Sequence, residues 1–190
     1  MVLKKRLLFL PSIKKMNEFH RKRAEIDRAV ISEVKKGRGV IYGGKALNEH
    51  LPPFLDRHTE DYDVFVKNPE QKARRLERRL DRKFGADLFA VVSAQHEGTF
   101  KVKNRVTEGT IADFTRTERK IPSVRRRGVM FASLPFIESG LRKELRSKSA
   151  EYRHARDRDA LNRIAVMKSL KKRKRRRAEE FFPIPTRLGW

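Results

Sequence analysis

Three aspartates are the candidate catalytic and metal-binding residues of this chain. Asp61 and Asp63 alternate at the start of an apolar stretch, and Asp113 lies on a later stretch of the same kind. Because strand side chains alternate faces at roughly 3.3 Å per residue, Asp61 and Asp63 point the same way with Cα atoms about 6.5–7 Å apart. Two such carboxylates can bind one cation or bridge two held roughly 4 Å apart. A third carboxylate on a neighbouring strand completes an oxygen site suited to Mg²⁺ or Mn²⁺.

A glycine pair, Gly43-Gly44, predicts a phosphate-binding turn. It follows the apolar residues 40–42, and a helical pattern begins directly after it. Glycines leave backbone N–H groups uncovered, and the positive end of a helix favours anions. Lys45, at the start of that helix, is explained equally well as a solvent-facing lysine and as a phosphate ligand.

The sequence predicts that these residues lie on or next to short strands that are separated by helices. Hydrophobic periodicity and turn residues predict strands over residues 40–42, 62–66, 88–94 and 129–132, and a hairpin over residues 99–103 and 110–115. Helices are predicted over residues 12–37, 45–51, 68–85, 135–145 and 153–170. Alternation of this kind predicts an α/β (α+β) domain.

The net positive charge is the most unusual feature of the composition. The 190 residues include 48 Lys and Arg against 24 Asp and Glu, which gives a net charge of +24. Such a surface predicts a polyanionic partner, with nucleic acid the first candidate and an anionic membrane surface the second. Two basic runs are candidate nucleic-acid contacts, or else a solvated loop and tail. They are Arg125, Arg126 and Arg127, and Lys171, Lys172, Arg173, Lys174, Arg175, Arg176 and Arg177.

Several classes of protein are excluded. The chain has no cysteine, so it has no disulfide, thiolate zinc site or cysteine nucleophile. No window approaches the roughly 18 consecutive apolar residues of a membrane span. Residues 1–11 resemble a short signal peptide, but their apolar run is too short and no small-residue cleavage site follows. We therefore expect a cytoplasmic protein that does not associate with membranes.

The order of the motifs resembles the DNA polymerase beta-like nucleotidyltransferase superfamily. That family has a hydrophobic strand, Gly-Gly or Gly-Ser, an Asp-x-Asp strand and a third Asp on a hairpin strand. The matching stretches are residues 41–44, 59–65 and 111–114. Residues 42–48, Tyr-Gly-Gly-Lys-Ala-Leu-Asn, are most similar to the poly(A) polymerase branch of large DNA viruses. Residues 156–159 resemble the late Arg-x-Lys-Asp stretch, with Arg158 where Lys is usual.

The resemblance implies a nucleotidyltransferase fold, a small mixed sheet flanked by helices, over residues 1–170. Residues 171–190 would then be a basic run, continuing a helical extension, and an apolar tail. By the same resemblance, Asp61 and Asp63 would hold two Mg²⁺ or Mn²⁺ ions. Asp113 would join the ion that activates the attacking hydroxyl and would take its proton. Gly43 and Gly44 would bind the triphosphate, assisted by Lys45 or Asn48.

The implied reaction is transfer of a nucleoside monophosphate from an NTP to a hydroxyl, with release of pyrophosphate. The net charge favours the 3′ end of RNA or DNA as acceptor, and the length leaves no room for a template-reading domain. Two alternatives stay open: a toxin-type enzyme that modifies tRNA or a protein, and a non-catalytic nucleic-acid-binding protein. Phe181-Phe182 resembles a sliding-clamp-binding motif in part, although the usual Gln and larger aliphatic residue are missing; packing on the domain is its alternative fate.

Overall fold

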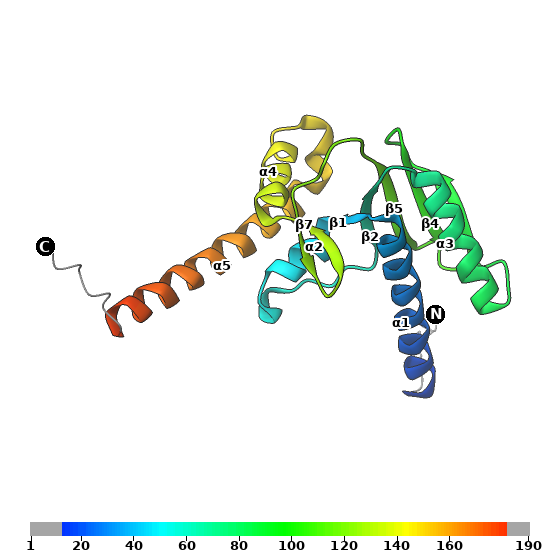
Figure 1. Cartoon of the computed structure of the whole chain (residues 1–190), viewed down its shortest axis with the longest axis horizontal. Helices are drawn as coiled ribbons and strands as arrows, with labels where there is room; N and C mark the ends of the chain where they lie inside the picture. Colours follow the sequence, from blue (N-terminus) through cyan, green and yellow to red (C-terminus); the bar gives the residue numbers. More distant parts are fainter. Residues whose placement is uncertain (1–12, 182–190) are drawn as a thin grey trace, which may run out of the picture.

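A single mixed sheet carries the motifs. The computed structural model describes the backbone of residues 13–181 and the side chains of residues 22–175. Within these residues seven strands pair in the order β3-β4-β5-β2-β1-β7-β6 (Figure 1). The strands are β1 Val40–Tyr42, β2 Tyr62–Val66, β3 Phe89–Ser93, β4 Thr99–Asn104, β5 Thr110–Arg116, β6 Ser123–Arg126 and β7 Val129–Ala132. The pairs β2–β5 and β1–β7 are parallel, and the other pairs are antiparallel.

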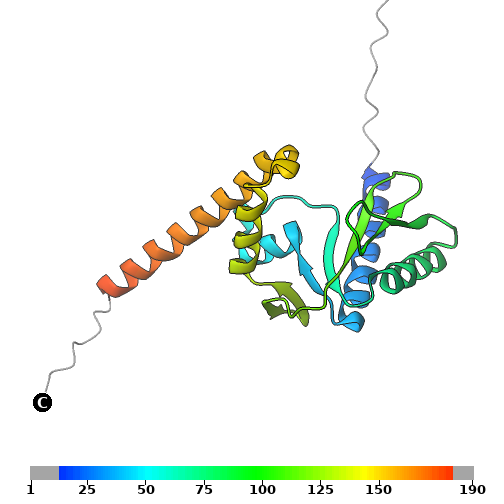
Figure 2. The same ribbon diagram turned by 90° about the horizontal axis from the view of Figure 1, so that it is seen from above.

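Helices cover the two halves of the sheet. They are α1 Ile13–Gly37, α2 Gly43–His50, α3 Pro69–Phe84, α4 Leu134–Glu144 and α5 His154–Phe181, with short 3₁₀ turns η1 Pro53–Leu55 and η2 Lys148–Arg153. Helix α3 packs on β3, β4 and β5 and contacts α1, whereas α4 packs on α5 and α2. In both views the second half of α5 projects away from the other elements (Figures 1 and 2). Among the described residues, no helix has the length and apolar character needed to cross a bilayer.

Local chemistry explains the limits of α3. Asn68-Pro69 starts the helix, because the missing N–H and fixed φ of proline suit its first position. Ala73, Leu76 and Leu80 follow at helical spacing and are fully buried. Gly85 ends the helix in the left-handed conformation, with a φ of 67°. The predicted bounds of this helix are confirmed.

Alternation along β2 and β5 separates the core from the site. Val64 and Phe114 are fully buried in the hydrophobic core, and they are cross-strand neighbours. Asp63 and Asp113 come one residue earlier on the same strands, so their side chains lie on the opposite face of the sheet. The strand that positions each aspartate therefore also anchors it through a buried apolar neighbour.

The observed elements confirm the expected mixed sheet flanked by helices and extend it in two places. The last helix, expected to end at Leu170, continues as α5 to Phe181, because residues 171–181 contain good helix formers and no Gly or Pro. The basic residues 171–177 are therefore helical. The edge strand β6, where we predicted no strand, contains Arg125 and Arg126 and pairs with β7. Phe182 and the Phe181 side chain, which carry the sliding-clamp prediction, lie outside the described residues.

Candidate active site

The pairing of β2 with β5 brings two of the three predicted carboxylates together. Asp63 lies directly opposite Asp113 in this parallel pair, and neighbouring strands are separated by about 4.8 Å. Asp61 directly precedes β2, two residues before Asp63. The placement of the third aspartate beside the Asp-x-Asp strand is therefore confirmed. The metal-binding roles of the three residues stay predictions.

Burial and the two neighbouring carboxylates together favour the protonated form of Asp63. Burial raises the pKa of Asp63 to about 7, and the nearby carboxylates of Asp61 and Asp113 act in the same direction. The guanidinium groups of Arg156 and Arg153 oppose this shift. A carboxyl that is partly desolvated beside two other carboxylates is stabilised in its ionised form by any cation that binds among them.

A lysine from the adjacent hairpin strand contacts the third aspartate. Lys101 on β4 is the cross-strand neighbour of Asp113, and its Nζ donates a hydrogen bond to Asp113 Oδ2 at 2.6 Å. The other oxygen, Asp113 Oδ1, is buried and has no hydrogen-bond partner. Burial raises the pKa of Asp113, while the hydrogen bond and charge of Lys101 act against that shift. Sequence reasoning did not identify Lys101 as a site residue.

The three aspartates fit a divalent cation by their chemistry. They are hard oxygen donors, they repel one another, and Asp113 Oδ1 is an acceptor without a donor. Their side chains do not converge on one point: over the described side chains, no group of three or more acidic, His or Cys residues is arranged to hold a metal ion. In this arrangement Lys101 engages Asp113 Oδ2.

The backbone of the glycine pair packs closely against Asp63 and Thr59. Gly43 has a φ of 65°, and a Cβ atom built on it would lie 2.0 Å from Asp63 Oδ2. A Cβ atom on Gly44 would lie 2.5 Å from the Thr59 methyl carbon. Helix α2 begins at Gly43, so its N-terminal backbone approaches the Asp63 carboxylate with no side chain between them. This close approach explains why both positions need glycine.

The two other predicted nucleotide ligands on α2 have protein partners. The Lys45 ammonium lies 4.8 Å from the centre of the Tyr62 ring, and burial lowers the pKa of Lys45. The Asn48 amide donates to the Arg57 carbonyl at 2.6 Å and accepts from the Arg57 N–H at 3.3 Å. Asn48 therefore holds the loop that follows α2. Nucleotide binding by Lys45 and Asn48 stays a prediction.

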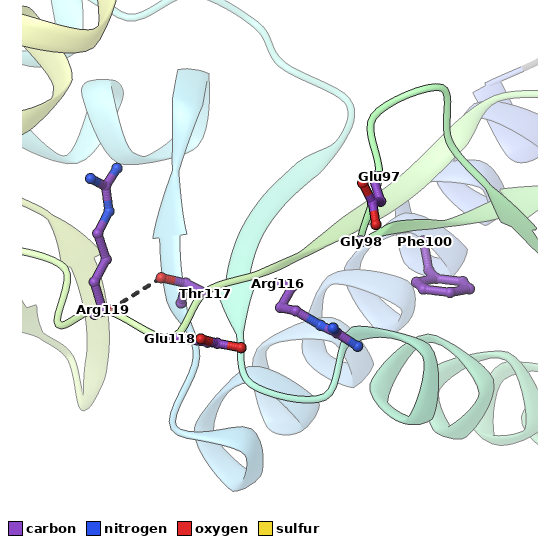
Figure 3. A pocket seen from close by; sticks show the side chains of 7 residues that line it. All are labelled: Glu97, Gly98, Phe100, Arg116, Thr117, Glu118 and Arg119. Carbon is purple, nitrogen blue, oxygen red and sulfur yellow. Dashed lines mark hydrogen bonds between the residues drawn. The ribbon is translucent and has the colours of Figure 1, made fainter.

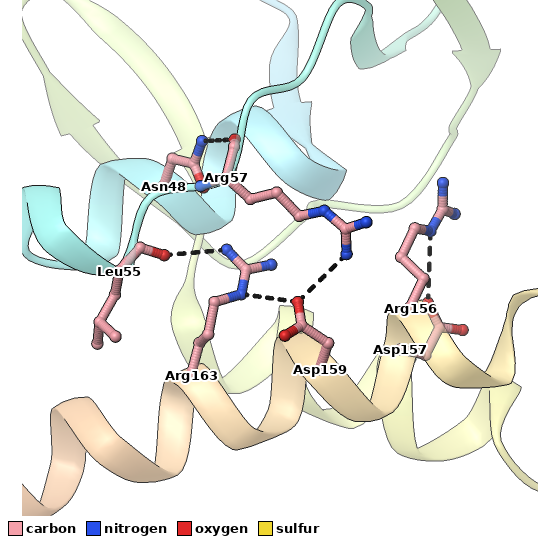
Figure 4. Close-up of polar contacts among 7 residues, drawn as sticks. All are labelled: Asn48, Leu55, Arg57, Arg156, Asp157, Asp159 and Arg163. Carbon is pink, nitrogen blue, oxygen red and sulfur yellow. Dashed lines mark hydrogen bonds and ion pairs between the residues drawn. The ribbon is translucent and has the colours of Figure 1, made fainter.

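A network of hydrogen bonds and ion pairs connects the loop that follows α2 to α5 (Figure 4). Arg57 Nη1 and Arg163 Nε both contact Asp159 Oδ2, at 3.3 and 3.1 Å. Arg163 Nη1 also donates to the Leu55 carbonyl at 3.2 Å. The network fixes the first half of α5 against the segment that leads into β2, and hence against the Asp61–Asp63 strand.

Two arginines where η2 meets α5 lie near Asp63. Asp157 is only 1% exposed and accepts from Arg153 Nε at 3.1 Å, with Arg156 Nε 4.0 Å from its other oxygen. Both arginines are close enough to lower the pKa of Asp63. The motif at residues 156–159 was recognised in the sequence, but neither Arg153 nor Arg156 was predicted to be a site residue. Only the packing of α5 reveals their position.

Hydroxyl groups line the sheet beside Asp63 and Asp113. The Tyr42 ring stacks on Phe65 with centroids 3.9 Å apart, and the Tyr42 hydroxyl lies 3.0 Å from Thr115 Oγ1. Thr99 Oγ1 donates to the same oxygen at 3.2 Å. Burial, with a smaller contribution from Asp63, raises the pKa of Tyr42, so this hydroxyl stays protonated at neutral pH.

The three arginines predicted to contact nucleic acid point in different directions. Arg125 shares a sheet face with Asp63, as the chain of cross-strand neighbours through β7, β1 and β2 shows. Arg126 lies on the opposite face and donates to the Glu49 carbonyl. Arg127 occupies the β6–β7 turn with a φ of 49°. Arg125 is therefore the member of this run best placed to contact a ligand at the carboxylates.

The surface has a hollow of about 610 Å³, and none of the three aspartates lines it. Figure 3 shows the side chains that do. It is lined by Glu97, Gly98, Phe100, Arg116, Thr117, Glu118 and Arg119. Arg116 and Phe100 alternate with the site residues on β5 and β4, so they lie on the opposite face of the sheet. This hollow is not part of the carboxylate site.

Comparisons with known proteins agree with this architecture. No protein-family model matches the chain, and no curated protein matches it. The crystal structure of the Megavirus polyadenylate synthase is similar, with a TM-score of 0.67 and 19% identity over 76% of this chain and 31% of that one. The Helicobacter pylori protein JHP933 matches with a TM-score of only 0.42 and 12% identity, over 75% and 61% of the two chains. The chain spans less than a third of the Megavirus protein, and the match establishes a shared nucleotidyltransferase fold.

Proposed function

We propose, from the shared fold, that this chain is a metal-dependent nucleotidyltransferase that extends the 3′ end of a nucleic acid without a template. The observation that carries the proposal is the pairing of Asp63 with Asp113 on parallel strands, beneath Gly43 at the start of α2. In this arrangement acidic groups adjoin a helix N-terminus that suits phosphates. Its products would resemble those of a poly(A) polymerase or terminal transferase.

The three aspartates would hold Mg²⁺ or Mn²⁺. A bound divalent ion would neutralise charge on the triphosphate and lower the pKa of the attacking hydroxyl. In the transfer itself, the 3′ oxygen forms a bond to the α-phosphorus, the bond to the bridging oxygen breaks, and pyrophosphate leaves. Asp113 Oδ1 accepts the hydroxyl proton, because the other oxygen, Oδ2, already accepts a hydrogen bond from Lys101.

Backbone and side-chain donors around the carboxylates would bind the triphosphate. The first N–H groups of α2 follow Gly43, and no side chain caps this helix. Arg153, at the end of η2, and Arg156, at the start of α5, add positive charge. Fixed donors of this kind stabilise the charge that develops on the phosphates in the transition state.

The acceptor would be held by the basic surfaces. Arg125 shares the sheet face of the carboxylates, and α5 carries the basic residues 171–177. Cations that contact phosphates release counterions, so they increase affinity for any nucleic acid. Such contacts would use part of the net charge of +24.

An assay of products tests the proposal. The full chain is incubated with end-labelled RNA, DNA or tRNA, each NTP or dNTP in turn, and Mg²⁺ or Mn²⁺. We expect a ladder of 3′-extended RNA or DNA that depends on a nucleotide and a divalent ion. Label transferred to the protein, or a single addition confined to tRNA, would indicate a modifying enzyme. Binding of the oligonucleotides with no transfer of any kind would overturn the proposal.

A further inference from the structure

We propose that the Lys101 ammonium is a built-in cation that takes the place of one divalent ion in this site. The chain would then bind one ion, at Asp61 and Asp63, rather than the two implied by the sequence resemblance. This inference rests on the proposed function, because it concerns the same carboxylates. It assigns Lys101 the role of a positioning residue for Asp113.

The position of Lys101 is fixed by the sheet. Lys101 and Asp113 are cross-strand neighbours on antiparallel strands, and their side chains meet at 2.6 Å. The Asp113 side chain is 13% exposed and the Lys101 side chain 35% exposed, so solvent screens this pair less than an ion pair on the open surface. The contact leaves Asp113 with one oxygen, Oδ1, for any other ligand.

The charge balance favours one divalent ion. Asp61, Asp63 and Asp113 together carry three negative charges when they are ionised. One divalent ion and the Lys101 ammonium together match that charge. In the nucleotide-free chain, a second divalent ion would have to displace the ammonium or enter a site that is already neutral, with Arg153 and Arg156 nearby. Either event weakens its binding.

The geometry of the carboxylates agrees with this division. Asp61 and Asp63 flank a single strand residue, whereas Asp113 is held from β4 by its own partner. The described side chains include no three-ligand group arranged for a metal ion. Lys101 therefore occupies Asp113 Oδ2, and its removal would leave both Asp113 oxygens available to a second cation.

Counting bound Mn²⁺ tests this inference. The full-length chain is titrated with Mn²⁺ alone, and free Mn²⁺ is followed by its electron paramagnetic resonance signal. The proteins compared are the unaltered chain, Lys101→Met, and Lys103→Met, which removes the same charge two residues along the same strand. We expect one ion per chain in the unaltered chain and in Lys103→Met, and two in Lys101→Met. Two ions, or none, in the unaltered chain, or no gain in Lys101→Met, would overturn the inference.

Thermal melting provides a second readout. Lys101→Met should melt at a lower temperature without metal, because Asp113 then lacks a cation beside Asp63. Mn²⁺ should raise its melting temperature more than that of the unaltered chain, and Lys101→Arg should behave like the unaltered chain. Equal Mn²⁺ shifts in all variants would contradict the inference. The proposed function is scored separately, by extension of RNA or DNA, so a chain with the expected ion counts and no transfer would refute the function alone.

Discussion

Gly43 and Asp63 are in such close contact that no other residue fits at position 43. A Cβ atom there would lie 2.0 Å from Asp63 Oδ2, and the backbone φ is 65°. The glycine thus links the helix N-terminus of α2 to the carboxylate of β2 without an intervening side chain. This relationship joins the proposed phosphate site to the proposed metal site.

Replacing Gly43 with alanine should displace the Asp63 carboxylate. We expect Gly43→Ala to reduce nucleotide transfer by about 10²-fold, since small misplacements of reacting groups have effects of this size. The strained φ should also lower the free energy of unfolding by about 1–2 kcal/mol. Activity and urea unfolding should be measured on the same preparation.

Gly85→Ala is the matched control for this variant. Gly85 has a φ of 67°, but nothing lies within 4 Å of a Cβ atom built on it. It should lose similar stability and keep its activity. Equal activity in the two variants would show that the contact with Asp63 does not matter.

The raised pKa of Asp63 predicts a dependence of stability on pH. Asp63 has a pKa of about 7 in the folded chain, against an ordinary value of 3.8. The folded state therefore binds the proton more tightly than the unfolded state, and this group's contribution to stability falls as the pH rises from about 4 to about 7. Asp63→Asn removes the group, so its unfolding free energy should fall less over that range. Parallel pH profiles for the two proteins would contradict the shifted pKa.

Asp113 should be more important for transfer than the nearby glutamates. Asp113→Asn should reduce activity by about 10²-fold or more if its carboxylate takes a proton in the reaction. Glu108→Gln and Glu118→Gln should stay within about two-fold of the unaltered chain, because Glu108 is exposed on the β4–β5 turn and Glu118 lines the hollow on the other face. An inactive glutamate variant with an active Asp113→Asn would identify a different third ligand.

The basic part of α5 should increase affinity for nucleic acid in a salt-dependent way. If all seven cations of residues 171–177 contacted single-stranded phosphates, their loss would change the log–log salt slope by about 5. A helix with 3.6 residues per turn directs only part of them to one side, so we expect a change of about 2–3 for the sevenfold Gln variant.

A double variant of α3, Arg78→Gln with Arg82→Gln, controls for the loss of positive charge at a site away from α5. These exposed arginines lie on a helix at the other end of the molecule (Figures 1 and 2). They should leave the salt slope nearly unchanged. If the α5 variant keeps the original slope, the nucleic-acid surface lies elsewhere, and Arg125 is the next residue to replace.

The sequence was informative where local chemistry decides the structure. The strand at Tyr62–Val66 and the helix between Asn68-Pro69 and Gly85 were predicted at or within a residue of their observed bounds. Alternation along the hairpin also predicted Asp113 beside the Asp-x-Asp strand, and the register confirms it. In each case a periodic pattern and a specific turn residue occur together.

The contacts of the site were harder to predict, because they depend on register and packing. Lys101 faces Asp113 only in the observed β4–β5 register, which shifts at an irregularity between Val102 and Lys103. Arg153 and Arg156 lie close enough to Asp63 to influence its pKa because α5 packs against the loop that follows α2. Neither fact is encoded in a pattern of neighbouring residues.

Extension of an end-labelled oligonucleotide by the unaltered chain, Asp61→Ala and Asp63→Ala tests the central claim most directly. Each protein is assayed with NTPs and Mg²⁺ or Mn²⁺, and its melting curve is recorded in parallel. We predict that the unaltered chain extends the 3′ end, and that both variants are inactive but melt at or above its melting temperature, because each removes a carboxylate that repels its neighbours. Full activity in either variant, or loss of folding together with loss of activity, would contradict a catalytic role for this pair.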